Sequence, residues 1–210
     1  MNSEPWSPSA PPKAGKPVNA YNTTAQLDRF EIRIAGFGGQ GVVTIGRILG
    51  IAFTVHDRKN SLNTQSYGPE SRGGACKSEI VVSDGDINYP YVRKADVFVC
   101  LSQTAYDTYI HDLKEDGILL FDPNSVQSDK IGDKDKTFEI PAMELSRQIG
   151  SVKFQNTVAL GALYLLVKEK LSEDALRKAI AENVPQETLK DNMEAFDIGL
   201  EHMKAHYATK

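Results

Sequence analysis

Residues 31–41 read EIRIAGFGGQG, and this stretch decides the fold. Apolar and polar residues alternate from Glu31 to Ala35, which predicts a β-strand. Beyond Gly41 the apolar residues recur at helical spacing as far as Phe53, which predicts a helix. A GxGxxG turn therefore lies between a strand and a helix, which is the context that a ligand-binding glycine turn requires.

The chemistry of such a turn follows from the absence of side chains. Glycine adopts positive φ and lets a ligand approach the backbone, while the N-terminus of the next helix offers free N–H groups to a phosphate. An alternative is that the glycines only allow the helix to pack closely on the strand. The residues of the turn that could contact a ligand are Gly36, Gly38, Gly39, Gln40 and Gly41.

A strand–GxGxxG–helix unit often binds NAD or FAD, so this alternative needs a test. Such a site uses a carboxylate near the end of the second strand to hold the ribose hydroxyls. Asp57 stands at a suitable distance along the chain, but it lies in the polar run 56–60. The next predicted strand, 61–65, is followed by Ser66 and has no carboxylate at its tip. This pattern disfavours dinucleotide binding.

A second loop, SYGPESRGG at residues 66–74, follows that strand and precedes another predicted over 75–82. Tyr67 and Arg72 stand out because loops present such side chains to ligands, and the guanidinium of arginine grips phosphates and carboxylates. In an open α/β sheet with this strand beside the first, both loops leave the same carboxyl edge and can face one ligand. The alternative is a rigid loop with a surface arginine.

The remaining sequence completes an α/β pattern. Strands are predicted over 96–102 and 117–122, with a crossover helix over 105–113. We predict a three-layer α/β/α fold with a doubly wound, mostly parallel sheet and a helical C-terminal segment. In that segment an apolar helix spans 157–167, and Pro185 separates two amphipathic helices. Asn156 precedes the apolar helix, where we favour a capping role over ligand contact.

Composition sets further limits. The chain has 210 residues, a formal net charge of -4 and a pI of about 5.6, which argues against a general nucleic-acid binder. No apolar run approaches the roughly 18 residues that cross a bilayer. Residues 1–29 carry five of the ten prolines, so we expect an extended or disordered arm, or an arm laid over a partner with Trp6 and Tyr21 as anchors. Residues 30–210 then form one α/β domain.

The cysteines and histidines do not form a recognisable metal-binding motif. Two cysteines, Cys76 and Cys100, cannot build a four-cysteine iron–sulfur or zinc site, and we expect both to be reduced, buried thiols of a cytosolic protein. Arg72 and Lys77 could lower the pKa of Cys76, although a strand cysteine is more often inert. His202 and His206 share a helix face, but no third ligand stands nearby in the sequence.

Three separated motifs together resemble a known family. The motifs are GFGGQGV at 36–42, SYGPESRGG with the following strand that carries Glu79, and QNTVALGAL at 155–163. They resemble the gamma subunit of 2-oxoacid:ferredoxin oxidoreductases, with the second loop most similar to the 2-oxoglutarate type. The resemblance covers about residues 31–166 and omits the proline-rich arm.

The resemblance implies a cytoplasmic, multisubunit enzyme of anaerobic metabolism. In that family a 2-oxoacid is decarboxylated on thiamine diphosphate with Mg²⁺, electrons pass through iron–sulfur clusters to ferredoxin, and the acyl group passes to coenzyme A. The alpha and beta chains hold thiamine diphosphate, and the clusters lie on beta- and delta-type chains. The gamma chain has no catalytic residue of its own and is associated with coenzyme A. The implied site residues are Gly36, Gly38, Gly39, Gln40, Gly41, Tyr67, Gly68, Arg72 and Gly73, to which we add Asn156.

Three other readings remain open at this point. The complex could reduce NAD through a separate flavin subunit, with an aryl or other 2-oxoacid as substrate. The chain could instead be a stand-alone NAD- or FAD-binding protein, or a purely structural subunit whose glycine loop only packs against a partner.

Overall fold

The structure is a computed structural model that describes residues 28–66, 75–127, 131 and 136–207. Residues 1–27 of the arm lie outside this range, as do the four residues predicted to bind a ligand in the second loop. These four are Tyr67, Gly68, Arg72 and Gly73.

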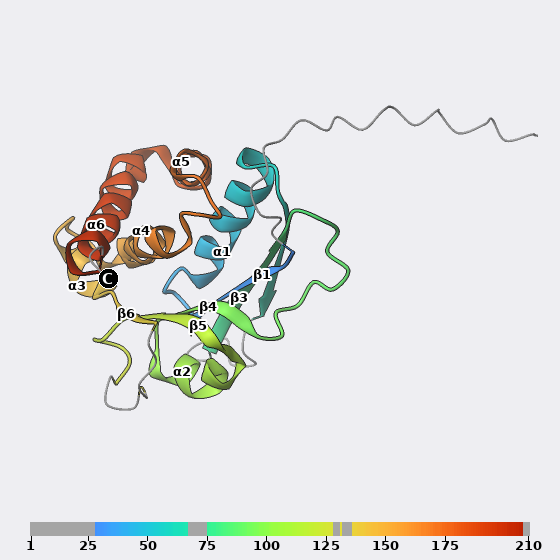
Figure 1. Cartoon of the computed structure of the whole chain (residues 1–210). Helices are drawn as coiled ribbons and strands as arrows, with labels where there is room; N and C mark the ends of the chain where they lie inside the picture. Colours follow the sequence, from blue (N-terminus) through green and yellow to red (C-terminus); the bar gives the residue numbers. More distant parts are fainter. Residues whose placement is uncertain (1–27, 67–74, 128–130, 132–135, 208–210) are drawn as a thin grey trace, which may run out of the picture.

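Six strands and six α-helices build the described part (Figure 1). The strands are β1 (Phe30–Phe37), β2 (Asn60–Ser66), β3 (Ala75–Ser83), β4 (Ala95–Cys100), β5 (Leu113–Phe121) and β6 (Thr137–Glu139). The helices are α1 (Val42–Ile51, continued by a π-helical turn Ala52–His56), α2 (Gln103–Tyr109), α3 (Ala142–Arg147), α4 (Gln155–Val167), α5 (Glu173–Asn183) and α6 (Leu189–Tyr207).

The strands form one sheet in the order β2-β3-β1-β4-β5-β6. β1, β4, β5 and β6 are parallel, whereas β3 runs antiparallel to both of its neighbours. The predicted mostly parallel α/β fold is confirmed, but the expectation that β2 lies beside β1 is wrong, because β3 separates them. β2 still runs in the direction of β1, so its end at Ser66 reaches the same carboxyl edge as the end of β1.

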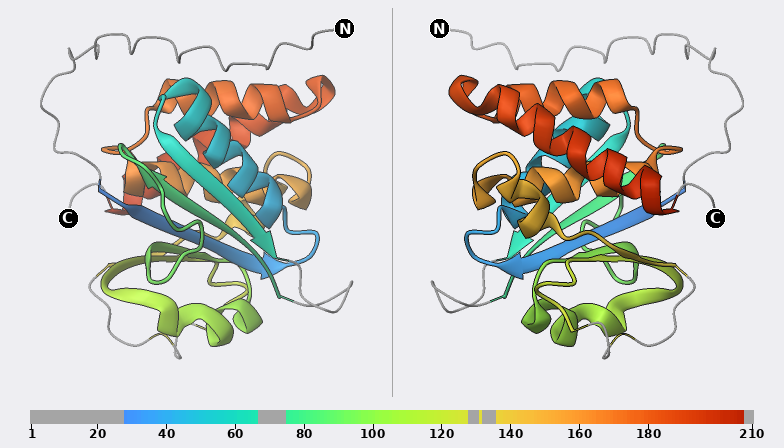
Figure 2. Two further views of the ribbon diagram at one scale, coloured as in Figure 1. Left: turned by 90° about the vertical axis from the view of Figure 1, so that its right-hand side faces the viewer. Right: turned by 90° about the vertical axis from the view of Figure 1, so that its left-hand side faces the viewer.

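Helices cover both faces of the sheet, which gives the three layers that we predicted (Figure 2). α1, α4, α5 and α6 cover one face, where they bury the side chains of Ile32 and Ile34 from β1. α2 covers the other face and packs against Phe98 of β4 and Phe121 of β5. No helix among the described residues has both the length and the apolar character that a membrane crossing needs.

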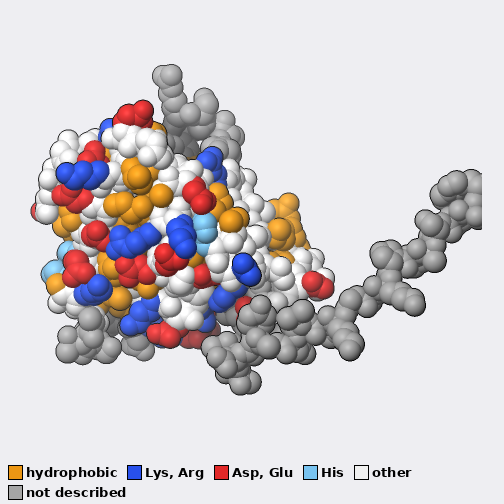
Figure 3. Space-filling model, turned by 90° about the horizontal axis from the view of Figure 1, so that it is seen from above, with side chains coloured by type: hydrophobic (Ala, Val, Ile, Leu, Met, Phe, Trp, Pro, Cys, Tyr) orange, Lys and Arg blue, Asp and Glu red, His pale blue; other side chains and the backbone are white. Residues whose placement is uncertain are grey.

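The C-terminal helices are joined by a close crossing and by surface ion pairs. α4 and α6 meet at Gly161 and Gly199, where each glycine lies against the backbone of the other helix. On the outer surface Arg177 of α5 pairs with Glu173 and with Asp197 of α6. Seen from above, this layer carries acidic and basic side chains side by side (Figure 3). Such exposed pairs add little stability, so apolar packing holds the layer together.

Candidate functional site

The glycine turn between β1 and α1 presents open backbone at the carboxyl edge of the sheet. Gly39 and Gly41 adopt positive φ values of 94° and 75°, which favour glycine. A Cβ added at Gly38 or Gly39 would meet nothing within 4 Å. No described residue therefore covers the backbone of these two glycines. The predicted ligand-binding turn therefore has the geometry to receive a group against its backbone.

Gln40 braces the turn. Its side-chain Oε1 accepts a hydrogen bond from the backbone N–H of Phe37 at 2.6 Å, and its Nε2 donates to the carbonyl of Leu101 at 2.8 Å. A Cβ at Gly36 would lie 2.5 Å from that Oε1, so glycine is needed there for the brace to form. Both ends of the carboxamide are thus occupied within the chain, which makes Gln40 a residue that holds the turn in shape.

Asn156 has a different role from the predicted cap. α4 begins at Gln155, its N-cap is Phe154, and no side chain caps it, so the capping prediction is wrong. The Asn156 side chain instead lies against Gly41, where an added Cβ would be 2.6 Å from the amide nitrogen. This contact joins the N-terminus of α4 to the N-terminus of α1.

The two helix N-termini that meet here differ in how their backbone N–H groups are satisfied. α1 has neither a side-chain cap nor an acidic residue in its first turn, whereas α5 begins with Ser172 as its cap followed by two acidic residues. α4 continues the 3₁₀ turn Val152–Phe154, whose N-cap Ser151 accepts a hydrogen bond from the backbone N–H of Lys153 at 3.3 Å. Lys153 adds a positive charge in the 3₁₀ turn before α4. The free N–H groups and the partial positive charge at the start of α1 favour an anion at the glycine turn.

The second loop begins and ends at this same edge. Ser66 at the end of β2 pairs with Lys77, and Ala75 at the start of β3 pairs with Phe37 of the glycine turn. The expectation that both loops leave the carboxyl edge is therefore confirmed at the residues that flank the second loop.

Comparisons with known proteins identify the family of this fold. The chain matches the pyruvate ferredoxin/flavodoxin oxidoreductase family over residues 31–202. The chain belongs to this family. It is 47% identical over 178 residues to the 2-oxoglutarate synthase subunit KorC of Methanocaldococcus jannaschii, an alignment that covers 84% of this chain and 95% of that protein.

Two solved structures of this oxidoreductase type share the fold. The gamma subunit of a keto/oxoacid ferredoxin oxidoreductase from Geobacter sulfurreducens matches with a TM-score of 0.74 and 37% identity, over 84% of this chain and 99% of that one. The 2-oxoglutarate:ferredoxin oxidoreductase of Magnetococcus marinus, which has 2-oxoglutarate, coenzyme A and succinyl-CoA bound, matches with a TM-score of 0.75 and 24% identity. That match covers 85% of this chain and 31% of the other.

These findings confirm the predicted class of protein. The chain is a gamma-type subunit of a multisubunit 2-oxoacid:ferredoxin oxidoreductase, and this reading is supported over a stand-alone dinucleotide enzyme. The position of Asp57 agrees with that outcome. Its carboxylate accepts hydrogen bonds from the backbone N–H and the hydroxyl of Ser172, at 2.7 and 2.6 Å, beyond the C-terminal end of α1. It therefore lies at the opposite end of that helix from the glycine turn.

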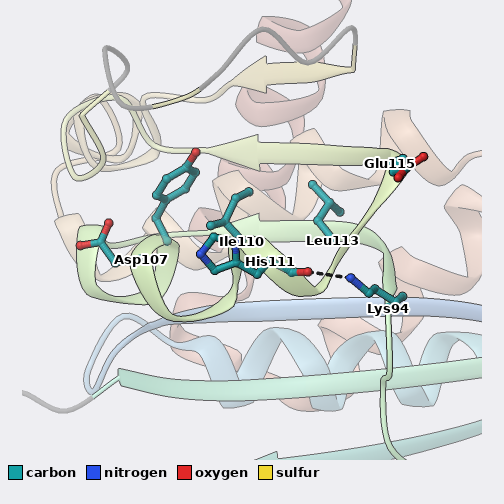
Figure 4. A pocket seen from close by; sticks show the side chains of 7 residues that line it. Lys94, Asp107, Ile110, His111, Leu113 and Glu115 are labelled. Atoms are coloured by element: carbon teal, nitrogen blue, oxygen red, sulfur yellow. Dashed lines mark hydrogen bonds between the residues drawn. The ribbon is translucent and has the colours of Figure 1, made fainter.

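The subunit also has a hollow of about 570 Å³ that is separate from the glycine turn (Figure 4). It lies toward the amino edge of the sheet, because Ala95 and Leu113 pair where β4 and β5 begin. No residue of the predicted site lines this hollow, and its lining combines acidic, basic and apolar side chains. We therefore place the candidate site at the glycine turn. The lining residues are Lys94, Tyr106, Asp107, Ile110, His111, Leu113 and Glu115.

The two cysteines of this oxidoreductase subunit are buried and free, as predicted. Burial raises the pKa of the Cys100 thiol to about 12 and also raises the pKa of Cys76. The expectation that Lys77 lowers the pKa of Cys76 is therefore wrong, and Arg72 lies outside the described residues. Because the thiolate is the reactive form, we expect neither thiol to react with Ellman's reagent at pH 8 in the folded protein. Both should react in denaturing urea. Rapid labelling of one thiol in the native state would contradict this expectation.

The two histidines of α6 form a stacked pair. The rings of His202 and His206 lie 4.2 Å apart between centroids, and His206 Nδ1 is 2.8 Å from the carbonyl oxygen of His202. Burial and the neighbouring ring lower the pKa of His202. Within the described residues no group of three or more His, Cys, Asp and Glu side chains could hold a metal ion.

Proposed function

We propose that this subunit binds coenzyme A at the glycine turn and positions it for acyl transfer on a partner subunit. The observation that carries the proposal is the open backbone at Gly38 and Gly39 beside the uncapped N-terminus of α1. The pyrophosphate of coenzyme A suits such donors, because charge-assisted hydrogen bonds to phosphate oxygens are strong. The coenzyme A bound in the Magnetococcus marinus enzyme supports the choice of ligand.

In this proposal each part of the chain has a physical task. Backbone N–H groups of the glycine turn hold the pyrophosphate, Gln40 keeps the turn in shape, and Asn156 fixes α4 against Gly41. Arg72 and Tyr67 of the second loop are proposed to contact the same ligand. The pantetheine arm then extends toward the partner, so the subunit contributes proximity and orientation and no bond chemistry.

The rest of the proposed reaction belongs to partner subunits of alpha, beta and delta type. These would supply thiamine diphosphate with Mg²⁺ for decarboxylation and iron–sulfur clusters for electron transfer to ferredoxin, in the cytoplasm. We propose 2-oxoglutarate as the 2-oxoacid, because the Methanocaldococcus jannaschii relative is a 2-oxoglutarate synthase subunit.

A purely structural glycine turn is the competing reading, and Gly38→Ala separates the two. A Cβ at Gly38 meets no atom of the described chain and no positive φ is present there, so the fold should tolerate it. It would stand where the phosphate approaches the backbone. Losing one charged hydrogen bond costs about 1.5–3 kcal/mol, so we expect the KM for coenzyme A to rise about 10- to 100-fold.

The measurement uses the reconstituted complex and follows 2-oxoacid-dependent acyl-CoA formation. kcat at saturating coenzyme A should change little, and the melting temperature should stay that of the unmodified chain. Gly50→Ala in α1 is the matched control, because its Cβ would make only an ordinary contact at 3.5 Å. An unchanged KM for coenzyme A in Gly38→Ala would show that the turn only packs.

A further inference from the structure

The connection between β3 and β4, residues 84–94, exposes two aromatic side chains. Tyr89 is 40% exposed and Tyr91 is 53% exposed, and their rings meet edge to face at 5.6 Å between centroids. We call residues 84–94 the tyrosine loop. In Figure 1 it is the green segment that stands away from the body of the protein. Two adjoining, partly exposed rings on one loop form an aromatic patch, and such patches mark interaction sites.

The tyrosine loop is held in one shape by two charged residues. Arg29 donates to the carbonyls of Tyr89 and Tyr91, at 2.8 and 2.9 Å. Glu31, only 4% exposed, accepts from the backbone N–H groups of Arg93 and Lys94, both at 3.1 Å. Arg29 and Glu31 also pair with each other. The second half of the loop is therefore anchored by these four hydrogen bonds.

Two further contacts anchor the loop. Val92 is buried in the core beneath α2, and Asn60 of β2 donates to the carbonyl of Gly85 at 2.9 Å. A loop that is ordered before binding loses less conformational entropy when a partner arrives. Rigid tyrosines on an ordered loop are thus suited to contact another protein, because tyrosine gives large contact area with few rotatable bonds.

Arg93 adds a charge to this surface. Its guanidinium lies over the Tyr89 ring at 4.5 Å from the centroid, and no carboxylate among the described residues pairs with its side chain. A hollow of about 260 Å³ lies beside it, lined by Arg29, Asp86, Asn88, Tyr89 and Arg93. Tyrosine and arginine are the residues enriched at the energetic centres of interfaces. The surface fits a partner that presents a carboxylate next to apolar side chains.

The relatives indicate which partner this is. The same fold makes up 99% of the Geobacter sulfurreducens gamma chain but only 31% of the Magnetococcus marinus chain. In the Magnetococcus marinus enzyme the gamma-type fold and the remainder of the chain are joined covalently. Where the gamma-type fold is a separate polypeptide, the subunit that corresponds to this remainder has to be held by a noncovalent contact. We propose that the tyrosine loop is the docking surface for that subunit, with Tyr89, Tyr91 and Arg93 as its centre.

The test measures binding of the full chain to that purified subunit by biolayer interferometry. We expect the double variant Tyr89→Ala/Tyr91→Ala to raise Kd about 30-fold or more, because hot-spot truncations have effects of this size. Arg93→Glu should weaken binding as well. Val55→Ala, at a side chain that is 60% exposed in the turn after α1, is the control and should change Kd less than about twofold.

Two further readouts keep the outcome decisive. The melting temperatures of the variants should match that of the unmodified chain, and kcat and the KM for coenzyme A should be normal once the complex is assembled at high subunit concentration. This separates the docking proposal from the coenzyme A proposal. An unchanged Kd in the double variant overturns it. So does an unmodified chain that forms a dimer which the double variant dissociates, because the loop would then contact a second copy.

Discussion

Gly199→Ala is expected to lower the free energy of unfolding by about 4 kcal/mol, because the two long C-terminal helices touch backbone to backbone at this residue. A Cβ at Gly199 would overlap the carbonyl oxygen of Val158 in α4 and stand 2.9 Å from its carbonyl carbon. Gly161 of α4 meets the Phe196 carbonyl of α6 in the same way. Neither contact can be relieved by turning a side chain, so the helices must move apart.

The measurement is urea unfolding followed by circular dichroism, with Gly50→Ala as the matched control. Gly50 is also a helical glycine, but its Cβ would make only an ordinary contact with Asn63. Alanine there should raise stability by about 0.5–1 kcal/mol, because glycine loses more backbone entropy on folding. If both variants change stability by the same amount and sign, the close crossing of α4 and α6 is not what makes Gly199 necessary.

This crossing illustrates what the sequence could and could not predict. The spacing of apolar residues predicted α4, and Pro185 predicted the break between α5 and α6. Both predictions agree with the structure. The sequence did not indicate that Gly161 and Gly199 face each other, since a helical glycine alone looks like a local weakness. Contact between distant elements depends on how the layers pack, which local periodicity does not record.

The candidate site was likewise predicted only in part from the sequence. The position of the glycine turn between β1 and α1 followed from residues 31–53, because strand and helix have different apolar periods. The roles of Gln40 and Asn156 did not follow. Gln40 reaches Leu101 at the end of β4, and Asn156 reaches Gly41, so both contacts join segments more than 60 residues apart. A sequence motif assigns such residues to a ligand site, but it does not show whether they contact the ligand or hold the site in shape.

The polar residues of β1 are a third example of a feature that the sequence predicted only in part. Alternation predicted the strand correctly, but it gave no sign that Arg33 is only 2% exposed. Its guanidinium pairs with Glu79 of β3 at 2.7 Å and with Asp112 at 2.7 Å, and it lies over the ring of Tyr109 at 5.1 Å. The polar face of the strand is therefore covered, and its charges are matched by partners from other elements. Such ion pairs can be identified only once the register of the strands is known, here with Arg33 opposite Glu79.

Arg33→Met is accordingly expected to lower the free energy of unfolding by about 4 kcal/mol, measured by urea unfolding. The loss comes from Glu79, which is also 2% exposed and would keep a buried negative charge. Among the described residues Lys77, at 2.9 Å, would be its one remaining ion-pair partner. Removing one partner of a buried pair is costly, whereas replacing both by apolar residues is often nearly neutral. The double variant Arg33→Met/Glu79→Leu should therefore recover most of the lost stability.

Lys77→Met is the matched control for the buried pair. Lys77 contacts the same oxygen of Glu79 but its side chain is 25% exposed, so its loss should cost no more than about 1 kcal/mol. We expect a large loss of unfolding free energy for Arg33→Met, a small loss for Lys77→Met, and recovery of most of the loss in the double variant Arg33→Met/Glu79→Leu. A double variant less stable than Arg33→Met would show that the guanidinium stabilises β1 through Asp112 and Tyr109 and not by neutralising Glu79.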